Sequence, residues 1–289
     1  MATQKKAYLY ACITVLFWST SASAFKISLR YLDVLPLLFY ASLVSTAALF
    51  LNLLFLKKLN LLKAFSKKDY LYSALLGFLN PFLYYAVLFK AYSMLLAQEA
   101  QPLNFIWPIT LVLLSIHLLK QKIKPKDILA TIISFIGVFI IATRGDILGF
   151  RFTSPTGVLL ATGSSVIWAL FWIYNVKDKR DEAVRLFLNF AFGSVFIFLS
   201  MLLFARVEIP KLQGIFGAAY IGLFETGITF LLWLKALKLS KTTAHIANLI
   251  FLVPFLSLVV ISLVVGEQIL SSSIIGLIFI VGGIILQKL

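Results

Sequence analysis

The feature that most constrains this chain is a succession of long apolar stretches separated by short polar segments. A transmembrane helix needs about 20 mostly apolar residues, and ten stretches of roughly this length follow one another along the 289 residues. With 27 Phe, 13% charged residues and a mean hydropathy of +1.00, the chain lacks the polar surface of a soluble domain. The sequence therefore predicts an all-α integral membrane protein with ten transmembrane helices, at roughly residues 7–29, 35–56, 70–91, 95–119, 127–143, 157–175, 184–205, 214–236, 243–265 and 271–287.

Positive charges lie mainly on one side of this predicted topology. The net charge of +15 would suit a nucleic-acid-binding protein, but the lysines occur in short runs between apolar stretches, as in LKKLNLLKAFSKKD and LKQKIKPKD. If the N-terminus is inside, 18 of the 26 Lys and Arg residues fall in cytoplasmic segments and five on the opposite side. The positive-inside rule then places both termini in the cytoplasm. We expect a multi-pass protein of the cell (inner) membrane that binds no nucleic acid.

The N-terminus and the cysteine content raise two smaller questions. Lys5 and Lys6, an apolar run and the sequence ASA at 22–24 also resemble a cleavable signal peptide. We favour a first transmembrane helix because this segment has a counterpart later in the chain. Cys12, the only cysteine, excludes an intramolecular disulfide framework.

The chain contains an internal repeat with a spacing of about 150 residues. The segment around Trp18, FWSTSASAFKISLRYLDVLPLLFYA, is echoed by IWALFWIYNVKDKRDEAVRLFLNFA around Trp168, and LFKAYSMLLAQEAQPLNFIWPI is echoed by LWLKALKLSKTTAHIANLIFLVPF. We therefore divide the chain into two five-helix repeats, 1–150 and 151–289, and the odd number of helices inverts the second within one integrated transmembrane domain. Inverted repeats are typical of alternating-access transporters; the alternative is a duplication in a membrane protein that transports nothing.

The repeats and three short motifs resemble a known family. The chain is similar over essentially its whole length to EamA-type members of the drug/metabolite transporter superfamily. LFWSTS at 16–21, EAQPLNFIWP at 99–108 and IWALFWIYNVKDK at 167–179 resemble the bacterial aromatic-amino-acid exporters. The resemblance implies two inverted repeats, ten helices, both termini inside, a central cavity and rigid-body rocking of the halves. It also implies a small-molecule substrate.

Polar side chains gather on one face of the predicted helix 95–119. At about 100° per residue, Gln98, Gln101 and Asn104 fall within roughly 120° of one another, and such a stripe would not face lipid. These amides can bind a zwitterionic ligand, or they can hold helices together, since amides commonly bond across membrane helices. Glu99 lies off this face, near the outer end. It is a candidate for binding a substrate ammonium or for titrating during transport; the alternative is a rim carboxylate paired with a nearby lysine.

Glu225 is the ionisable residue placed deepest in the predicted bilayer, near the middle of the helix 214–236. A carboxylate at that depth costs about 2.5–3.5 kcal/mol on insertion scales, so it should point inward or be protonated. Its counterpart in the first repeat is Asn80. The candidates for proton coupling are Glu225 first, then Glu99 and His245. The alternatives are a buried, hydrogen-bonded glutamic acid at 225 and a hydrogen-bonded helix-end histidine at 245.

Aromatic residues are placed to line a central cavity. Trp18 and Trp168 lie within the first helices of the two repeats, although anchoring at the membrane interface is the commoner place for Trp. Opposing tryptophans can stack on an aromatic ring or a cation. The complete predicted substrate site comprises Trp18, Ser21, Asn80, Tyr84, Gln98, Glu99, Gln101, Asn104, Trp107, Trp168, Phe171 and Asn248.

Signals for other functions are missing from the sequence. No glycine-rich phosphate loop occurs, and the two His and one Cys are too scattered for a metal site. We therefore expect no cofactor, no metal and no enzymatic activity; the alternatives from other classes are an intramembrane lipid-handling enzyme and a membrane scaffold. The charge-free segments ILATIISFIGVFIIA and SSIIGLIFIVGGIIL suit close helix packing, including packing at a dimer contact, so the protein is either a monomer or a homodimer.

The sequence thus predicts a secondary transporter that exports amino acids or related small metabolites by alternating access. Among amino acids, the aromatic ones are the class that the resemblance indicates. The alternative within the same fold is a carrier of drugs or other metabolites. Facilitated efflux and proton antiport both stay open.

Overall fold

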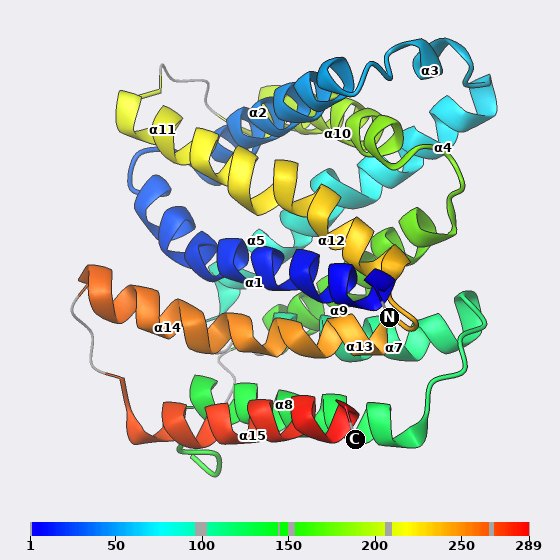
Figure 1. Cartoon of the computed structure of the whole chain (residues 1–289). Helices are drawn as coiled ribbons and strands as arrows, with labels where there is room; N and C mark the ends of the chain where they lie inside the picture. The colour runs from blue at the N-terminus through cyan, green and yellow to red at the C-terminus, as the bar shows by residue number, and fades with distance from the viewer. Residues whose placement is uncertain are drawn as a thin grey trace.

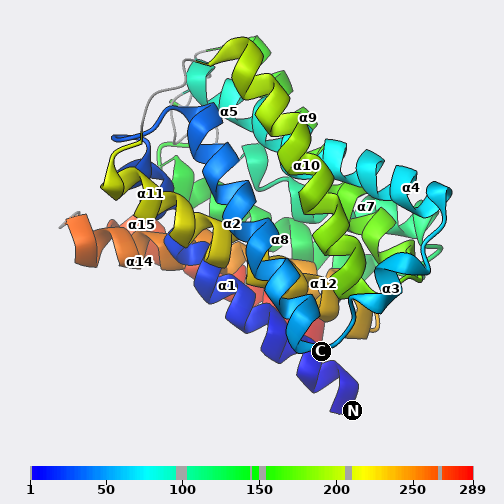
Figure 2. The same cartoon turned by 90° about the horizontal axis from the view of Figure 1, so that it is seen from above.

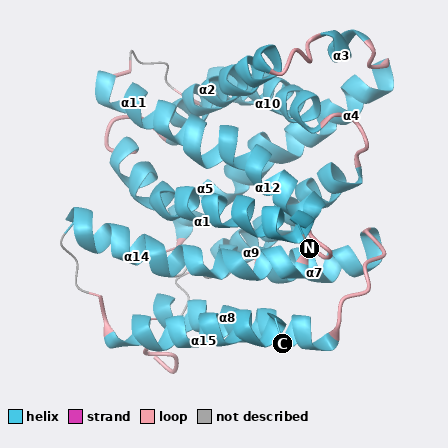
Figure 3. Cartoon of the chain, in the orientation of Figure 1, coloured by secondary structure: helices cyan, strands magenta, loops and turns pink. Residues whose placement is uncertain are grey.

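The computed structural model describes residues 2–95, 103–143, 145–149, 154–205, 210–265 and 269–288. Within these ranges the regular elements are helices, and no described residue is in a strand (Figure 1, Figure 3). The predicted all-α class is confirmed for this part of the chain. Three residues of the predicted site, Gln98, Glu99 and Gln101, lie outside the described residues.

The helices follow the apolar stretches of the sequence. In the first half, defined as residues 2–149, they are α1 (Ala2–Ser28), α2 (Val34–Phe55), α3 (Asn60–Lys63), α4 (Lys67–Gly77), η1 (Phe78–Leu83), α5 (Tyr84–Met94), α7 (Trp107–Leu118) and α8 (Pro125–Ala142). In the second half, residues 154–288, they are α9 (Pro155–Lys177), α10 (Glu182–Phe204), α11 (Leu212–Tyr220), η2 (Ile221–Gly227), α12 (Ile228–Leu239), α13 (Ala244–Ala247), η3 (Asn248–Phe251), α14 (Leu252–Val265) and α15 (Ser271–Lys288).

Several of these segments are long enough to cross a membrane. Among the described residues, six helical segments have the length and apolar composition of a membrane span: Thr3–Phe25, Val34–Phe55, Lys67–Leu88, Pro155–Lys177, Glu182–Phe204 and Leu212–Leu239. Shorter apolar helices occur at Trp107–Leu118, Ala244–Ser257 and Ser271–Gln287. The total of ten spans and the cytoplasmic placement of the termini stay predictions.

Local sequence signals explain where helices begin. The Ser66 hydroxyl accepts a hydrogen bond from the Asp69 backbone N–H at 3.3 Å, and Asp69 Oδ2 accepts one from the Ser66 backbone at 2.9 Å. This reciprocal capping box starts α4. Asp181 starts α10 in a related way, since its Oδ1 accepts hydrogen bonds from the backbone N–H groups of Ala183 and Val184.

Two helices are interrupted at corresponding places in the two halves. Between α4 and α5, Asn80 leaves the helical conformation (φ −155°, ψ 125°), and Pro81 has no backbone N–H to continue the ladder. Between α11 and α12, the chain widens into η2, and the Thr229 hydroxyl donates to the Phe224 carbonyl at 2.5 Å. Interrupted membrane helices expose backbone groups that need partners, and they commonly occur where a site is lined.

Helices of one half pack largely against helices of the other. Helix α1 of the first half lies against α12 of the second half. In the same way, α9 of the second half lies against α5 of the first. Helix α2 packs on both α10 and α11 and runs between them in the view from above (Figure 2). Helices α8 and α15 pack on each other at one edge of the molecule (Figure 1). This interleaving brings both interrupted helices to the boundary between the halves.

Glycines allow the closest approaches at this boundary. A Cβ on Gly77 would lie 2.3 Å from the backbone oxygen of Asn189 in α10, and one on Gly222 would lie 2.5 Å from the backbone oxygen of Ala41 in α2. No side chain fits at either distance without backbone movement. The interrupted helix of each half therefore packs closely against the second long helix of the other half, which is α10 for the first half and α2 for the second.

Candidate functional site

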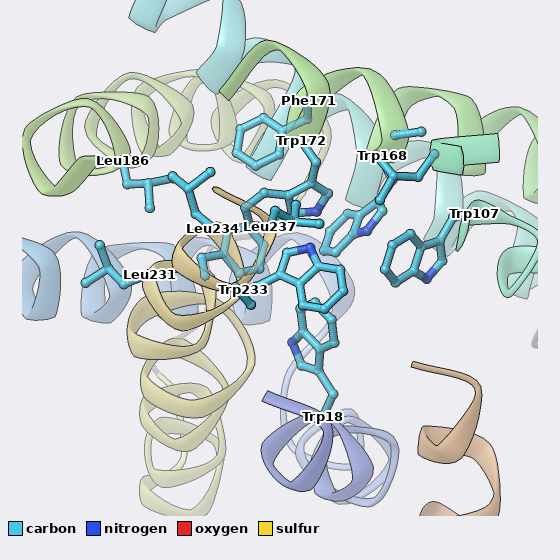
Figure 4. Packing of buried hydrophobic residues seen from close by; sticks show 14 of the residues in the cluster. Trp18, Trp107, Trp168, Phe171, Trp172, Leu186, Leu231, Trp233, Leu234 and Leu237 are labelled. Atoms are coloured by element: carbon cyan, nitrogen blue, oxygen red, sulfur yellow. The ribbon is translucent and has the colours of Figure 1, made fainter. Parts of the chain in front are cut away.

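All five tryptophans of the chain meet in one cluster at the boundary between the halves. The ring centroid of Trp18 lies 6.3 Å from that of Trp107, 6.0 Å from that of Trp168 and 5.5 Å from that of Trp233. Trp172 joins through Trp168, at 5.8 Å. The rings come from α1 and α7 of the first half and from α9 and α12 of the second (Figure 4). We call these five residues the tryptophan cluster.

Other aromatic side chains extend the cluster. Tyr84 contacts Trp168 with ring centroids 4.3 Å apart and planes tilted by 42°, and Phe171 contacts Trp172 at 5.0 Å. All of these rings are buried. Trp18 and Trp168, which we predicted to line a central cavity from opposite repeats, pack against one another here, and Tyr84, Trp107 and Phe171 lie with them. That these rings line a cavity stays a prediction.

Indole N–H groups in the tryptophan cluster are unevenly paired. Trp18 Nε1 donates to the backbone carbonyl of Glu225 at 2.9 Å. The Nε1 atoms of Trp168, Trp172 and Trp233 are buried and have no hydrogen-bond partner among the described residues. A buried donor without a partner is unfavourable. The centre of the molecule is therefore aromatic and also rich in available donors.

Glu225 lies beside this cluster in η2. Its Oε1 accepts a hydrogen bond from the Tyr85 hydroxyl at 3.1 Å, and Ser21 also hydrogen-bonds its carboxylate. Both partners belong to the first half, whereas Glu225 belongs to the second. Glu225 as a whole residue is half-buried. It therefore links the halves directly next to Trp18.

Asn80 lies at the corresponding interruption in the first half. Its side chain is fully buried, and neither its amide nitrogen nor its amide oxygen has a hydrogen-bond partner among the described residues. An amide has two donors and two acceptor positions to satisfy. The polar capacity of Asn80 is thus unused in this conformation.

Asn104 lies close to the tryptophan cluster, but not in the continuous helix that we predicted. Leu103 and Asn104 are helical, and a turn at Phe105 and Ile106 separates them from α7, which begins at Trp107 with Pro108 in its first turn. Asn104 Nδ2 donates to the Tyr84 hydroxyl at 3.2 Å and to Ser164 Oγ at 3.4 Å. Pro108 favours this late start because a helix accepts proline best where its N–H would have no partner.

The two predicted residues near the end of the chain lie in α13 and η3, whose buried apolar residues belong to the same core as the tryptophan cluster. His245 is in α13, where its Nδ1 shares a hydrogen bond of 2.5 Å with the Thr242 hydroxyl. Asn248 is in η3, fully buried, and its amide atoms have no hydrogen-bond partner among the described residues. The contact of His245 matches the helix-end alternative more directly than the coupling role, which stays a prediction.

A narrow apolar hollow lies next to Glu225, between α1, α2, η1, α10 and η2. Tyr85 and Thr226 provide its polar edge. Thr226 shares a hydrogen bond of 2.5 Å with Ser45. Ser42 is the third polar residue of the lining. The other lining side chains are apolar, and they include Phe25, Leu38, Pro81 and Phe190.

A charged network closes one end of the boundary. Arg180 binds the Asp178 carboxylate through Nη2 at 2.6 Å and through Nε at 3.0 Å. Its Nη1 donates to the Asp69 carbonyl at 2.6 Å and to the Ser73 hydroxyl at 3.0 Å, both in the first half. Arg180 thus ties the α9–α10 connection to α4. This is the end that the charge distribution predicts to be cytoplasmic.

A second ion pair supports the same closure. Lys58 Nζ lies 2.6 Å from Asp181 Oδ2 and joins the end of α2 to the start of α10. Burial raises the pKa of Asp181, but the hydrogen bonds from Lys58 and the α10 backbone outweigh it and hold that pKa below its ordinary value. The Asp181 carboxylate is therefore charged at neutral pH.

Sequence reasoning missed several of these residues. Trp233 and Tyr85 looked like ordinary aromatic residues of a strongly apolar chain, and only contacts with the other half distinguish them. The network had a visible signal, the alternation of acids and bases in KDKRDEAVR at 177–185. We had interpreted its positive charges only as an indication of topology.

Comparison with known proteins adds a family to this geometry. The family model described as the EamA-like transporter family matches residues 5–143 and again residues 155–287. An uncharacterized transporter of Clostridium kluyveri is 26% identical over 297 residues, which cover 98% of this chain and 93% of the relative. The uncharacterized transporter YvbV of Bacillus subtilis is 28% identical over 285 residues, covering 96% and 90% of the two chains.

A solved crystal structure shares the fold. It superposes with a TM-score of 0.82 at 20% sequence identity, and the match covers 98% of this chain and 96% of the other. At this identity the likeness concerns the arrangement of helices alone.

Proposed function

The protein belongs to the EamA-like transporter family, and we propose that within this family it exports amino acids or related small metabolites by alternating access. Its family and relatives make it a multi-pass membrane transporter of small molecules, and they point to a non-enzymatic carrier. The exported class and the direction of transport belong to our proposal.

The observation that carries the proposal is the convergence of both halves on one aromatic and polar site. Trp18, Tyr84 and Trp107 come from the first half, and Trp168 and Trp233 from the second. A ligand bound among them would contact both halves, so a change in their relative position would change its access. Alternating access by rocking halves works in this way.

The chemistry of the site favours an amphipathic ligand with an ammonium group. Tryptophan faces attract aromatic rings and cations, and Glu225 is an acceptor beside them. The amides of Asn80 and Asn104 and the indole N–H groups supply donors for a carboxylate. Aromatic amino acids combine these features, which supports the class that the sequence motifs indicate.

A transport assay tests this proposal directly. Purified protein in liposomes is supplied with labelled amino acids, drugs and other metabolites, with and without a pH gradient. We expect counterflow of amino acids, strongest for aromatic ones. Movement of drugs without amino acids would favour the alternative carrier, and a panel in which no solute moves would contradict the transporter proposal for these classes.

We further propose that Glu225 couples transport to protons. Its position between the halves, with Tyr85 and Ser21 as partners, lets a change of charge alter contacts across the boundary. Glu225→Gln should then remove the stimulation of export by a pH gradient while counterflow without a gradient persists. The exposed Asp33 provides the control, Asp33→Asn, which should keep the pH response. An unchanged pH response in Glu225→Gln would exclude the coupling role.

A further inference from the structure

Arg185 is a completely buried arginine in the first turn of α10. This is an unfavourable place for a cation, because the helix N-terminus carries a partial positive charge and burial removes the guanidinium from water. A buried charge is normally matched by charges and hydrogen bonds on every side. The contacts of Arg185 therefore indicate what it is arranged to hold.

Among the three guanidinium nitrogens of Arg185, only Nη1 has hydrogen-bond partners among the described residues. Nη1 donates to the backbone carbonyl of Asp178 and, at 3.4 Å, to that of Arg180. The nearest carboxylate oxygen, Asp178 Oδ1, lies 3.9 Å from the same Nη1 atom. Nε and Nη2 are buried and have no hydrogen-bond partner among the described residues.

These two nitrogens form one edge of the guanidinium. Their N–H bonds point in parallel from the side of the planar group, so they can meet both oxygens of one carboxylate or of one phosphate group. Arginine is favoured at sites that recognise these anions because this fork is rigid and always charged. The unpaired edge of Arg185 therefore has the geometry of an anion-binding fork.

The acid nearest to Arg185 does not fill this fork. The Asp178 carboxylate is bound by Nε and Nη2 of Arg180, whose own Nη1 is held by α4. The Arg180 guanidinium also lies over the rings of Phe65 and Tyr72, at 5.1 Å and 5.4 Å. Arg180, held in place by Asp178, thus makes the closing contact with α4 of the other half, and Arg185 is the buried cation of the same network.

We propose that Arg185 binds the carboxylate of the transported molecule through Nε and Nη2 when the cytoplasmic end opens. Opening has to separate Arg180 from α4, because that contact spans the two halves. Loss of this contact makes the network accessible from the predicted cytoplasmic side. The inference rests on the proposed function and assigns the substrate an anionic group recognised at the entry side.

The test compares a carboxylate with neutral forms of the same molecule. Equilibrium binding of phenylalanine, its amide and its methyl ester is followed by the fluorescence of the five tryptophans, and counterflow of the three compounds is measured in liposomes. The variants are Arg185→Gln, which removes the charge, and Arg185→Lys, which keeps the charge but loses the fork. Lys179→Gln removes an exposed charge from the same segment and is the matched control.

We expect Arg185→Lys and Arg185→Gln to weaken phenylalanine binding by about tenfold or more, as for the loss of a charged hydrogen-bonded partner. Binding of the amide and ester should change less than about twofold, and Lys179→Gln should resemble the wild type. If Arg185→Gln does not fold, Arg185→Lys alone gives the comparison. An equal loss for acid, amide and ester would overturn the inference, because it would indicate a structural role.

Two further results separate this inference from the proposed function. Carboxylate-selective binding that depends on Arg185, without counterflow of any solute, would support the site and contradict the transport proposal. Competition by inorganic phosphate or by a phosphate monoester, without binding of any carboxylate, would overturn the assignment of the ligand as a carboxylate.

Discussion

The two interrupted helices, around η1 and η2, break at corresponding positions for different physical reasons. In η1 the break follows from the sequence, since Pro81 cannot continue the helical ladder and Asn80 adopts an extended conformation. In η2 no proline is present, and the widened turn is supported by side chains, including the Thr229 hydroxyl on the Phe224 carbonyl. The first break thus follows from the covalent structure of proline, and the second depends on side-chain contacts.

The polar residues at the two breaks differ in the same way. Glu225 in η2 has partners from the opposite half, Tyr85 and Ser21. Asn80 in η1 is buried without a partner among the described residues. The two halves therefore share an arrangement of helices but differ in chemistry. The η2 break carries the hydrogen-bonded carboxylate of Glu225, whereas the η1 break carries the Asn80 amide, which has no described partner. A ligand between them meets an asymmetric site.

The largest expected effect concerns the glycines that seat each break. Gly77→Ala and Gly222→Ala place a Cβ within 2.3 Å and 2.5 Å of a backbone oxygen of the opposite half. We expect each to lower the free energy of unfolding by about 1–3 kcal/mol through overpacking, measured as a drop in the thermal midpoint in detergent. Gly163→Ala is the control, since a Cβ there meets nothing within 4 Å. Equal midpoints for all three variants would mean that the close approach is absent.

An intermediate effect is expected at the paired acid. Tyr85→Phe removes the hydroxyl that donates to Glu225 Oε1 at 3.1 Å. A hydrogen bond to a charged group contributes about 1.5–3 kcal/mol, so the free energy of unfolding should fall by an amount near the lower end of that range when Glu225 is ionised. In Glu225→Gln, the same substitution should have a smaller effect. A double-mutant cycle measures the difference, and strict additivity would show that the two side chains do not interact.

The smallest effect on stability is expected at the unpaired amide. Asn80→Leu removes a buried polar group that has no described partner, so stability should change by less than about 1 kcal/mol or increase. If the amide contributes to ligand binding, the apparent affinity for the transported solute falls all the same.

A second asparagine serves as control for this prediction. Asn175 is also buried, but its Nδ2 donates to the Phe171 carbonyl at 2.8 Å and its Oδ1 accepts from Asn189 at 3.1 Å. Asn175→Leu should therefore lower stability by about 1–3 kcal/mol. A loss of stability in Asn80→Leu as large as in Asn175→Leu would contradict the interpretation that the Asn80 amide is unused.

Local patterns in the sequence were sufficient to predict much of the architecture. The stretch 35–56 corresponds to α2 at Val34–Phe55, and 184–205 corresponds to α10 at Glu182–Phe204. Hydropathy identifies such helices because a helix that crosses the bilayer needs about 20 mainly apolar side chains, which face lipid or the protein interior. The stretch 95–119 was harder, since a turn at Phe105 and Ile106 interrupts it before α7 begins at Trp107. Apolar composition does not show where a helix starts inside a membrane.

The site was only partly accessible to sequence reasoning. Trp18 and Trp168 were found because the repeat places them at equivalent positions. Tyr85 and Trp233 had no comparable signal, because aromatic residues are frequent in this chain. Arg185 was counted as a cytoplasmic charge, and nothing in the order of residues indicated that its guanidinium is fully buried.

By itself, the sequence determined that the chain is a helical membrane protein built from similar halves, because hydropathy and repetition are properties of short segments. Only the tertiary structure decided which side chains meet. The contact of Trp18 with the Glu225 backbone joins residues separated by 207 positions, and the Arg180 contact with Asp69 joins two halves of the chain. Such contacts depend on how helices cross and rotate, and these angles are set by packing among all of them.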